Sequence, residues 1–335
     1  MFATLLGALP RPPLSGRPEV VAASGAALDT FDALEPGLRR LADDEAVSEA
    51  LMAQQRAGLE PLTDGGLRRR SRSGAMTSVA IDWAFAAAGS SRAVKQALPG
   101  PYSLGWSVDG SGNGSAAARR RATLAQAEAL NAEAHALRAA GCPLVEIDER
   151  AAVRIGDHAP ERQLFTDAHR RLTDGLADLH LSLALSGGNA DTAGASTFFD
   201  LPYASYALDL IAGPDNWRLV TAAPADRGIV CGALGPGEHD DDGPELLVWA
   251  AHYAASAKGR GLARVGLANG PGLELGSWAA AERKFVRLAD AARIAALESA
   301  EELAQALDPR AVNSRSAAFG RAVPATPPRR AGKQK

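Results

Sequence analysis

Short apolar segments alternate with longer amphipathic segments along most of the chain, and this alternation limits the folds that the sequence can adopt. Most of the apolar segments are bounded by glycine, proline or asparagine, which is typical of buried parallel strands. The predicted strands are Phe2–Leu6, Leu59–Thr63, Val94–Leu98, Leu144–Ile147, Leu179–Leu185, Ala207–Ile211, Gly228–Leu234 and Leu262–Leu267.

The amphipathic segments between these strands carry apolar residues at helical spacing. The predicted helices are Leu38–Ala57, Ala116–Ala140, Glu161–Leu176, Pro244–Ala257 and Trp278–Leu307. Eight strands interleaved with helices over roughly 300 residues are the content of a (β/α)8 barrel, whereas a doubly wound sheet normally has fewer strands. We therefore predict an α/β fold in which residues 1–308 form one (β/α)8 TIM barrel.

Composition narrows the class of protein. The chain has 36 Lys and Arg against 39 Asp and Glu, a net charge of −3, so it lacks the global positive field that would attract nucleic acid or an anionic membrane. Seven basic side chains and no acidic one lie in residues 309–335, which predicts a disordered basic tail. We expect a small-molecule substrate, with no nucleic-acid or membrane partner. The sequence does not indicate the oligomeric state.

Two features bear on localisation. Cys142 and Cys231, the two cysteines, both lie in apolar segments, which fits a reducing compartment. The longest apolar runs fall far short of the ~20 residues of a membrane helix, and the N-terminus lacks the basic flank and apolar stretch of a signal peptide. We expect a cytoplasmic protein.

Polar residues that follow the predicted strands are the candidates for chemistry, because (β/α)8 active sites lie at the carboxyl ends of the strands. Asp148 and His239 are the catalytic candidates, and those for substrate binding are Arg11, Asp64, Trp106, Ser186, Asn189, Asp209 and Asn269. Asp148 is expected to line a small-ligand pocket with Asp64 and Arg11. Its alternative role is to cap the next helix.

The sequence supports more specific expectations for Asp148, Trp106 and His239. Asp148 and Glu149 are adjacent at a strand end, so at most one should point into the barrel mouth while the other supports a loop. Trp106 offers an aromatic face to a flat ligand, or packs in the core. His239, beside Glu238, is either a general acid or base near neutral pH or a solvated loop histidine.

Four strand-end segments carry a resemblance to a known family. They are Gly7-Ala8-Leu9-Pro10-Arg11-Pro12, Thr63-Asp64-Gly65-Gly66-Leu67-Arg68-Arg69, Val94-Lys95 with Pro99-Gly100-Pro101-Tyr102-Ser103-Leu104, and Val145-Glu146-Ile147-Asp148-Glu149-Arg150-Ala151. In this order and with comparable spacing they resemble segments of the catalytic C-terminal barrel of cobalamin-independent methionine synthase. That barrel belongs to a superfamily that also contains uroporphyrinogen decarboxylase. The likeness covers roughly residues 2–300.

The resemblance implies an activity and its cofactors. It implies transfer of a methyl group from a polyglutamated methylfolate to the sulfur of homocysteine, with zinc deprotonating the thiol. It also implies that Asp148 binds substrate and that the pterin stacks on Trp106. The family's zinc ligands are a His-x-Cys pair after the fifth strand, a Glu near the sixth and a Cys after the eighth.

The sequence departs from the family at these zinc ligands. When Gly188-Asn189 is placed on the family's Gly-Asn, Ala184 and Ser186 occupy the positions of the histidine and the cysteine. The alternative register, His180-Leu181-Ser182, keeps a histidine but still lacks the thiol. Asp209 stands near the expected Glu, and the segment that begins at Asn269 contains no cysteine. We therefore expect neither zinc nor another metal or cofactor.

The amino-acid pocket differs as well, since Ala8 and Gly66 replace a serine and a glutamate that hold homocysteine in the family. The leading hypothesis is thus an enzyme that carries out zinc-independent transfer of a methyl, one-carbon or alkyl group, or lyase chemistry, on a small molecule. The alternatives are a non-catalytic binding or scaffold barrel, a metal-independent decarboxylase, and the zinc-dependent methylfolate–homocysteine S-methyltransferase.

Overall fold

The computed structural model describes residues 1–13, 36–68, 78–108, 115–238 and 243–307. The predicted tail and His239 lie outside these ranges. Residues 1–295 form one compact unit, and residues 296–335 form a second. The boundary at residue 308 between barrel and tail therefore stays a prediction. None of the helices in the described ranges is long and apolar enough to cross a membrane.

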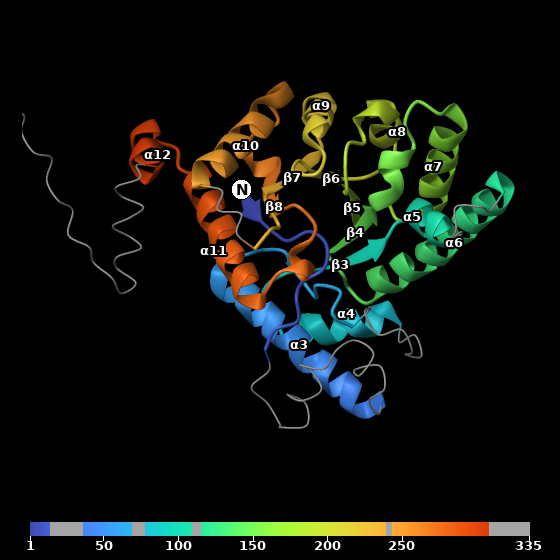
Figure 1. Ribbon diagram of the computed structural model, residues 1–335, viewed down its shortest axis with the longest axis horizontal. Helices are drawn as coiled ribbons and strands as arrows, with labels where there is room; N and C mark the ends of the chain where they lie inside the picture. The colour runs from blue at the N-terminus through green and yellow to red at the C-terminus, as the bar shows by residue number, and fades with distance from the viewer. Residues whose placement is uncertain (14–35, 69–77, 109–114, 239–242, 308–335) are drawn as a thin grey trace, which may run out of the picture. The chain divides into compact units, whose positions relative to one another are not determined.

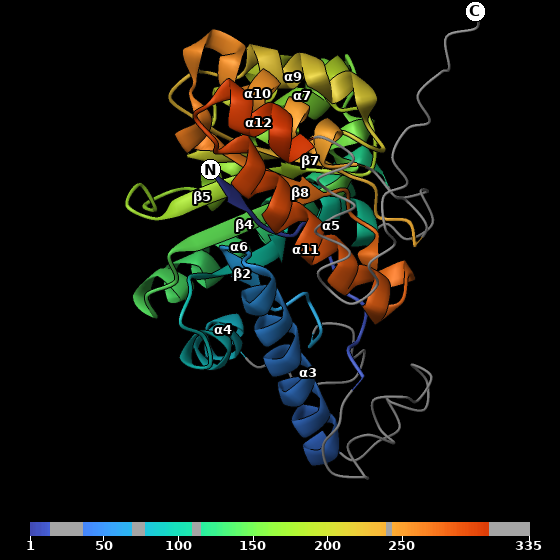
Figure 2. The same cartoon turned by 90° about the vertical axis from the view of Figure 1, so that its left-hand side faces the viewer.

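All eight predicted strands are present in one parallel sheet with the order β1-β8-β7-β6-β5-β4-β3-β2. Figures 1 and 2 show the strands surrounded by helices. The strands are β1 Phe2–Ala3, β2 Leu62–Thr63, β3 Val94–Pro99, β4 Leu144–Glu149, β5 His180–Leu185, β6 Ser205–Asp209, β7 Gly228–Leu234 and β8 Val265–Asn269. The predicted (β/α)8 fold class is confirmed.

The barrel closes between β1 and β2 through two hydrogen bonds. The Glu60 amide donates to the Ala3 carbonyl over 2.9 Å, and the Thr4 hydroxyl donates to the Pro61 carbonyl over 2.7 Å. These bonds join the two edges of the sheet in place of a regular strand ladder.

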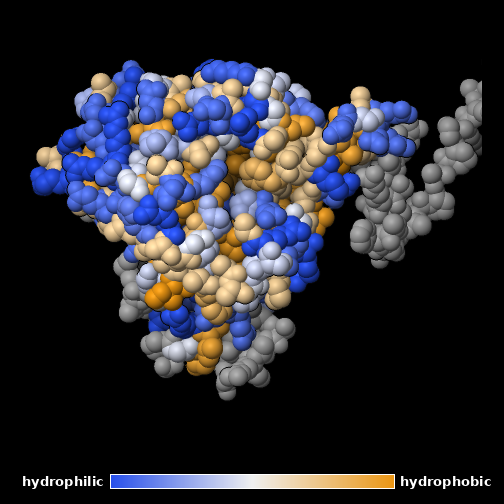
Figure 3. Space-filling view, turned by 180° about the vertical axis from the view of Figure 1, so that it is seen from behind, coloured by the Kyte–Doolittle hydropathy of each residue, from blue (hydrophilic) through white to orange (hydrophobic). Residues whose placement is uncertain are grey.

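Helices follow the strands around the barrel. They are α3 Pro36–Ala57, α4 Val79–Ala88, α5 Pro101–Val108, α6 Ala116–Ala139, α7 Ala159–Leu172, α8 Ala195–Phe199, α9 Trp217–Ala222, α10 Pro244–Ser256 and α11 Trp278–Ala295, with α12 Ala300–Leu307 in the second unit. The sequence pattern does not predict α4, α5, α8 and α9, because helices of five to ten residues show too few turns to establish a helical period. On the face drawn in Figure 3, hydrophilic and hydrophobic residues are interspersed.

Several predicted segments need correction. The strands β1 and β2 are shorter than the predicted Phe2–Leu6 and Leu59–Thr63, and β6 lies two residues earlier than the predicted Ala207–Ile211. The predicted helix Trp278–Leu307 is two helices, because Ser299 caps a new helix by accepting a hydrogen bond from the Glu302 amide. The predicted last strand began too early, since residues Leu262–Arg264 form a 3₁₀ turn before β8.

Small side chains fill the middle of the barrel. The buried cluster there consists of Leu6, Ala184, Ala207, Val230 and Ala268, with Phe2 packed against it. Ala184, which the sequence resemblance places at the zinc-ligand histidine, thus packs as one of several methyl groups. Polar side chains lie on either side of this apolar layer, toward the carboxyl and the amino ends of the strands.

Candidate functional site at the carboxyl ends of the strands

Asp148, Arg150 and Ser186 form a polar cluster at the ends of β4 and β5, which we call the carboxyl-end site. Asp148 Oδ1 accepts a hydrogen bond from the Ser186 hydroxyl over 2.7 Å, and Oδ2 accepts one from Arg150 Nε over 3.0 Å. The Arg150 side chain is 51% exposed and that of Asp148 is 20% exposed. The site therefore combines an exposed guanidinium and a partly exposed carboxyl with the buried hydroxyl of Ser186.

Arg150, rather than Arg11, is the arginine that pairs with Asp148. Burial acts to lower the pKa of Arg150, but the charge and the hydrogen bond of Asp148 outweigh it and raise this pKa above its usual value. Arg150 immediately follows the predicted pair Asp148-Glu149, and this position beside a strand-end carboxyl is the sequence signal that indicates it.

Glu149 points away from the mouth, as expected for the neighbour of Asp148 in a strand. Its Oε1 accepts hydrogen bonds from the Tyr102 amide over 2.8 Å and from His169 Nε2 over 3.0 Å. Its Oε2 accepts one from the Ser103 amide and one from the Ser103 hydroxyl, over 2.8 and 2.5 Å. With Nε2 as the donor, His169 Nδ1 accepts from the Tyr203 hydroxyl over 2.6 Å. We call Glu149, Ser103, His169 and Tyr203 the Glu149 network.

The Glu149 network holds the backbone beside the site. Ser103 Oγ also accepts a hydrogen bond from the Ala151 amide over 2.9 Å, which ties the start of α5 to the turn that carries Arg150. Burial raises the pKa of Tyr203 well above its usual value, so its hydroxyl remains a donor. Glu149 and His169 are themselves fully buried. These residues therefore hold in place the backbone that carries the carboxyl-end site.

Three predicted binding residues have side chains engaged by neighbouring loops. Asp209 accepts hydrogen bonds from the amides of Gly187, Ile211 and Ala212 over 3.0–3.1 Å. Asn189 and Asp215 exchange two hydrogen bonds of 2.9 Å. Asn269 accepts from the Leu6 amide and donates to the carbonyls of Leu6 and Gly270. These contacts indicate that the three side chains hold the loops of the mouth in place.

Replacing Asn269 by alanine is expected to lower the free energy of unfolding by about 2–3 kcal/mol, because three buried backbone groups at the ends of β1 and β8 lose their partner. Urea unfolding of the wild type and the variant measures this loss. Unchanged stability together with weakened binding at the carboxyl-end site would instead support the predicted role in substrate binding.

The side chains of Arg11 and Asp64 each contact nearby groups of the protein. Arg11 forms an ion pair with Asp43 of α3. Asp64 is buried, and its Oδ1 accepts a hydrogen bond from the Gly66 amide over 3.0 Å. Gly65 and Gly66 both have φ of +64°, a conformation that favours glycine. Gly66 therefore supports a turn at the position where the resembled family has its glutamate.

The Asp43 carboxyl predicts a pH dependence of stability. Burial raises its pKa from 3.8 to about 6, against the opposing charges of Arg11 and Arg68. A raised pKa in the folded state contributes stability that is complete below pH 3.8 and is lost as the pH rises through about 6. Relative to Asp43→Asn, the wild type should therefore lose about 1–2 kcal/mol between these pH values, less than the full shift implies because the site is partly solvated. Urea unfolding of both proteins across this range tests it, and parallel stability curves would contradict it.

Trp106 lies under two guanidinium groups. The Arg119 guanidinium carbon is 4.2 Å from the centre of a Trp106 ring, and that of Arg154 is 5.1 Å away. A flat ligand that stacked on the face occupied by either arginine would displace that cation–π contact.

The donor set does not fit a zinc ion. Within the described ranges, no group of three or more His, Cys, Asp and Glu side chains is arranged to hold a metal. The Ser186 hydroxyl donates a hydrogen bond to Asp148, and Ala184 supplies only a methyl group. Burial raises the pKa of Cys142 to about 11 and that of Cys231 to about 12, which disfavours a thiolate at either position.

Solved structures with the same fold include two methionine synthases. A B12-independent methionine synthase from Shewanella sp. W3-18-1, in complex with selenomethionine, matches with a TM-score of 0.68 and 17% identity over 87% of this chain and 96% of that chain. A putative vitamin-B12 independent methionine synthase from Listeria monocytogenes matches with a TM-score of 0.63 and 17% identity over 87% of this chain and 97% of that one. No protein-family model and no curated protein sequence matches.

Proposed function

We propose that this protein is an enzyme of the methionine-synthase-like barrel superfamily that transfers a methyl, one-carbon or other alkyl group between small molecules at the carboxyl-end site, without a resident zinc ion. The observation that carries this proposal is the cluster of Asp148, Arg150 and Ser186 at the end of the barrel where such folds place their chemistry. The shared fold and the four strand-end segments support the choice of superfamily.

The three side chains can divide the chemistry of such a transfer. Without a metal, an acceptor such as a thiol, whose ordinary pKa is about 8.5, needs a base to become a nucleophile. Asp148 accepts the proton, the acceptor forms its bond to the transferred carbon, and the donor leaves with the electron pair of the broken bond. Ser186 orients the Asp148 carboxyl, and Arg150 stabilises negative charge on the bound molecules. In the related lyase chemistry, the same carboxyl would remove a proton from the substrate carbon.

The second candidate is a non-catalytic binding barrel. It is favoured by the internal hydrogen bonds of Asn189, Asp209 and Asn269, which leave these three polar side chains engaged by the protein itself. On this alternative, Asp148 and Arg150 bind a small molecule that leaves unchanged.

Transfer of a ¹³C-labelled methyl group tests the proposal. Protein dialysed against a chelator is incubated with labelled methylfolate, a methyl thioether or a methyl sulfonium as donor and with homocysteine or a simple alkyl thiol as acceptor. We expect the methyl resonance to move from a donor to an acceptor at a rate that added zinc does not change. Turnover only after zinc is added would identify the S-methyltransferase of the resembled family. Saturable binding without turnover would support the binding barrel, and release of carbon dioxide from a carboxylated substrate would indicate a decarboxylase.

A further inference from the structure

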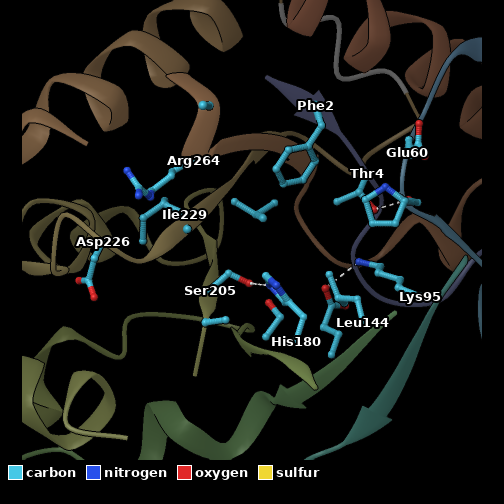
Figure 4. A pocket seen from close by; sticks show the side chains of 17 residues that line it. Phe2, Thr4, Glu60, Lys95, Leu144, His180, Ser205, Asp226, Ile229 and Arg264 are labelled. Atoms are coloured by element: carbon cyan, nitrogen blue, oxygen red, sulfur yellow. Dashed lines mark hydrogen bonds and ion pairs between the residues drawn. The ribbon is translucent and has the colours of Figure 1, made fainter. Parts of the chain in front are cut away.

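A cavity of about 570 Å³ lies at the opposite end of the barrel from the carboxyl-end site. Residues near the amino ends of the strands line it, among them Phe2 on β1, Lys95 on β3, His180 on β5 and Ile229 on β7 (Figure 4). We call it the amino-end cavity. Its volume falls within the range of small-molecule sites, about 300–1,000 Å³.

One wall of the amino-end cavity is polar. Glu146, Ser182 and Ser205 are register partners on the adjacent strands β4, β5 and β6, so they form one row across the inner surface of the sheet. Lys95 Nζ donates to Glu146 Oε2 over 2.6 Å, and both side chains are at most 4% exposed. His180 Nε2 and the Ser205 hydroxyl hydrogen-bond over 2.9 Å.

This polar row has hydrogen-bonding capacity that the described part of the protein does not use. Within these ranges, Lys95 Nζ donates only to Glu146, although an ammonium has three protons to donate. Ser182 is 2% exposed, yet its hydroxyl forms no hydrogen bond to a described residue. A buried ion pair stabilises a protein only when further hydrogen bonds complete it. The row is therefore suited to a ligand group that both donates and accepts hydrogen bonds.

The remaining lining residues are apolar, and they indicate an apolar ligand body. Phe2, Leu144, Ile229 and Val230 present apolar side chains to the same space. Burying an apolar body against them stabilises a complex by roughly 25 cal/mol per Å² of apolar surface removed from water. The cavity thus joins an apolar wall to a short polar row, as ligand pockets generally do.

The charges around the cavity indicate that the polar group of the ligand is uncharged. Lys95 and Glu146 neutralise each other in the depth of the cavity, so a ligand carboxylate would face Glu146 and a ligand ammonium would face Lys95. Partial burial lowers the pKa of His180, which disfavours a positive charge on its ring. At the rim, Glu60 and Asp226 outnumber Arg264 and further disfavour an anion.

We propose that the amino-end cavity is a second ligand site, which binds a small neutral molecule with an aromatic or aliphatic body and one hydroxyl or amide group. The apolar body lies against Phe2 and Ile229, and the polar group hydrogen-bonds to Ser182 and the Lys95–Glu146 pair. This site is separate from the carboxyl-end site, and the proposal does not depend on the reaction proposed there.

The fluorescent probe 2-naphthol tests the proposal, because it is neutral at pH 7 and joins a flat apolar body to one hydroxyl. Titration of the full chain should give saturable binding at one site. The anion 2-naphthoate has the same ring system and should bind at least about tenfold more weakly, a difference of about 1.4 kcal/mol. Absence of saturable 2-naphthol binding, or equal affinity for the anion, would overturn the proposal.

Two alanine-to-tryptophan variants locate the bound probe. Ala263 is exposed and lines the cavity, so Ala263→Trp should obstruct it without disturbing the core and weaken 2-naphthol binding at least about tenfold. Ala132→Trp, at an exposed position of α6 outside the cavity, is the matched control and should bind as the wild type does. Equal binding by both variants would place the probe elsewhere and overturn the assignment.

Ser182→Val should weaken 2-naphthol binding but not that of naphthalene, which lacks the hydroxyl.

Discussion

Replacement of Asp148 by asparagine is expected to lower turnover in the ¹³C-methyl assay at least about 100-fold, the usual effect of losing a general base. The neutral amide of asparagine is too weak a base to remove the proton of the acceptor molecule. The negative charge opposite Arg150 also disappears. The melting temperature should change little, because the Arg150 side chain is 51% exposed and pairs of this kind contribute little to stability.

Asp157→Asn is the matched control for this prediction. Asp157 is exposed and follows the same strand, nine residues beyond Asp148, so its replacement should leave both turnover and melting unchanged. A lower melting temperature of Asp148→Asn with unaltered binding and turnover would show that Asp148 is a structural residue, as in the helix-capping interpretation.

The strands could be predicted because their signal is local. A buried parallel strand needs a run of apolar residues between turn-forming residues, and β5 and β7 show this pattern directly in the sequence. The eight-strand count then selected the barrel, and the barrel placed Asp148 and Ser186 at one end. That the two side chains touch follows from their positions at the ends of adjacent strands.

The roles of Asn269 and Asp209 could not be predicted in this way. Both were selected as strand-end polar residues, yet a strand-end position is compatible either with binding a ligand or with holding a loop. The choice depends on which backbone groups lie within hydrogen-bonding distance, such as the Leu6 amide, which is 263 residues from Asn269 in sequence. Pairings over such separations leave no periodic signal.

The amino-end cavity escaped prediction for a related reason. The predicted site residues follow the strands, whereas Glu146, Ser182 and Ser205 lie within or at the start of them. Inward-pointing polar residues in three adjacent strands, read together with the strand register, would have been the signal. The register becomes known only when the strands are aligned in the sheet.

The Glu149 network carries the largest expected effect on stability. Glu149→Ala is expected to lower the free energy of unfolding by at least about 4 kcal/mol, because the buried Tyr102 amide, the partly buried amide and hydroxyl of Ser103, and the His169 ring lose their acceptor at once. Urea unfolding measures the loss, and Asp178→Ala, which removes an exposed carboxyl paired with Arg138, serves as the control that should leave the unfolding midpoint unchanged. Glu149→Gln should retain part of the network and lose less stability than Glu149→Ala. If Glu149→Ala unfolds at the wild-type midpoint, the network does not hold α5 and the turn of Arg150 in place, and the positioning role assigned to it is wrong.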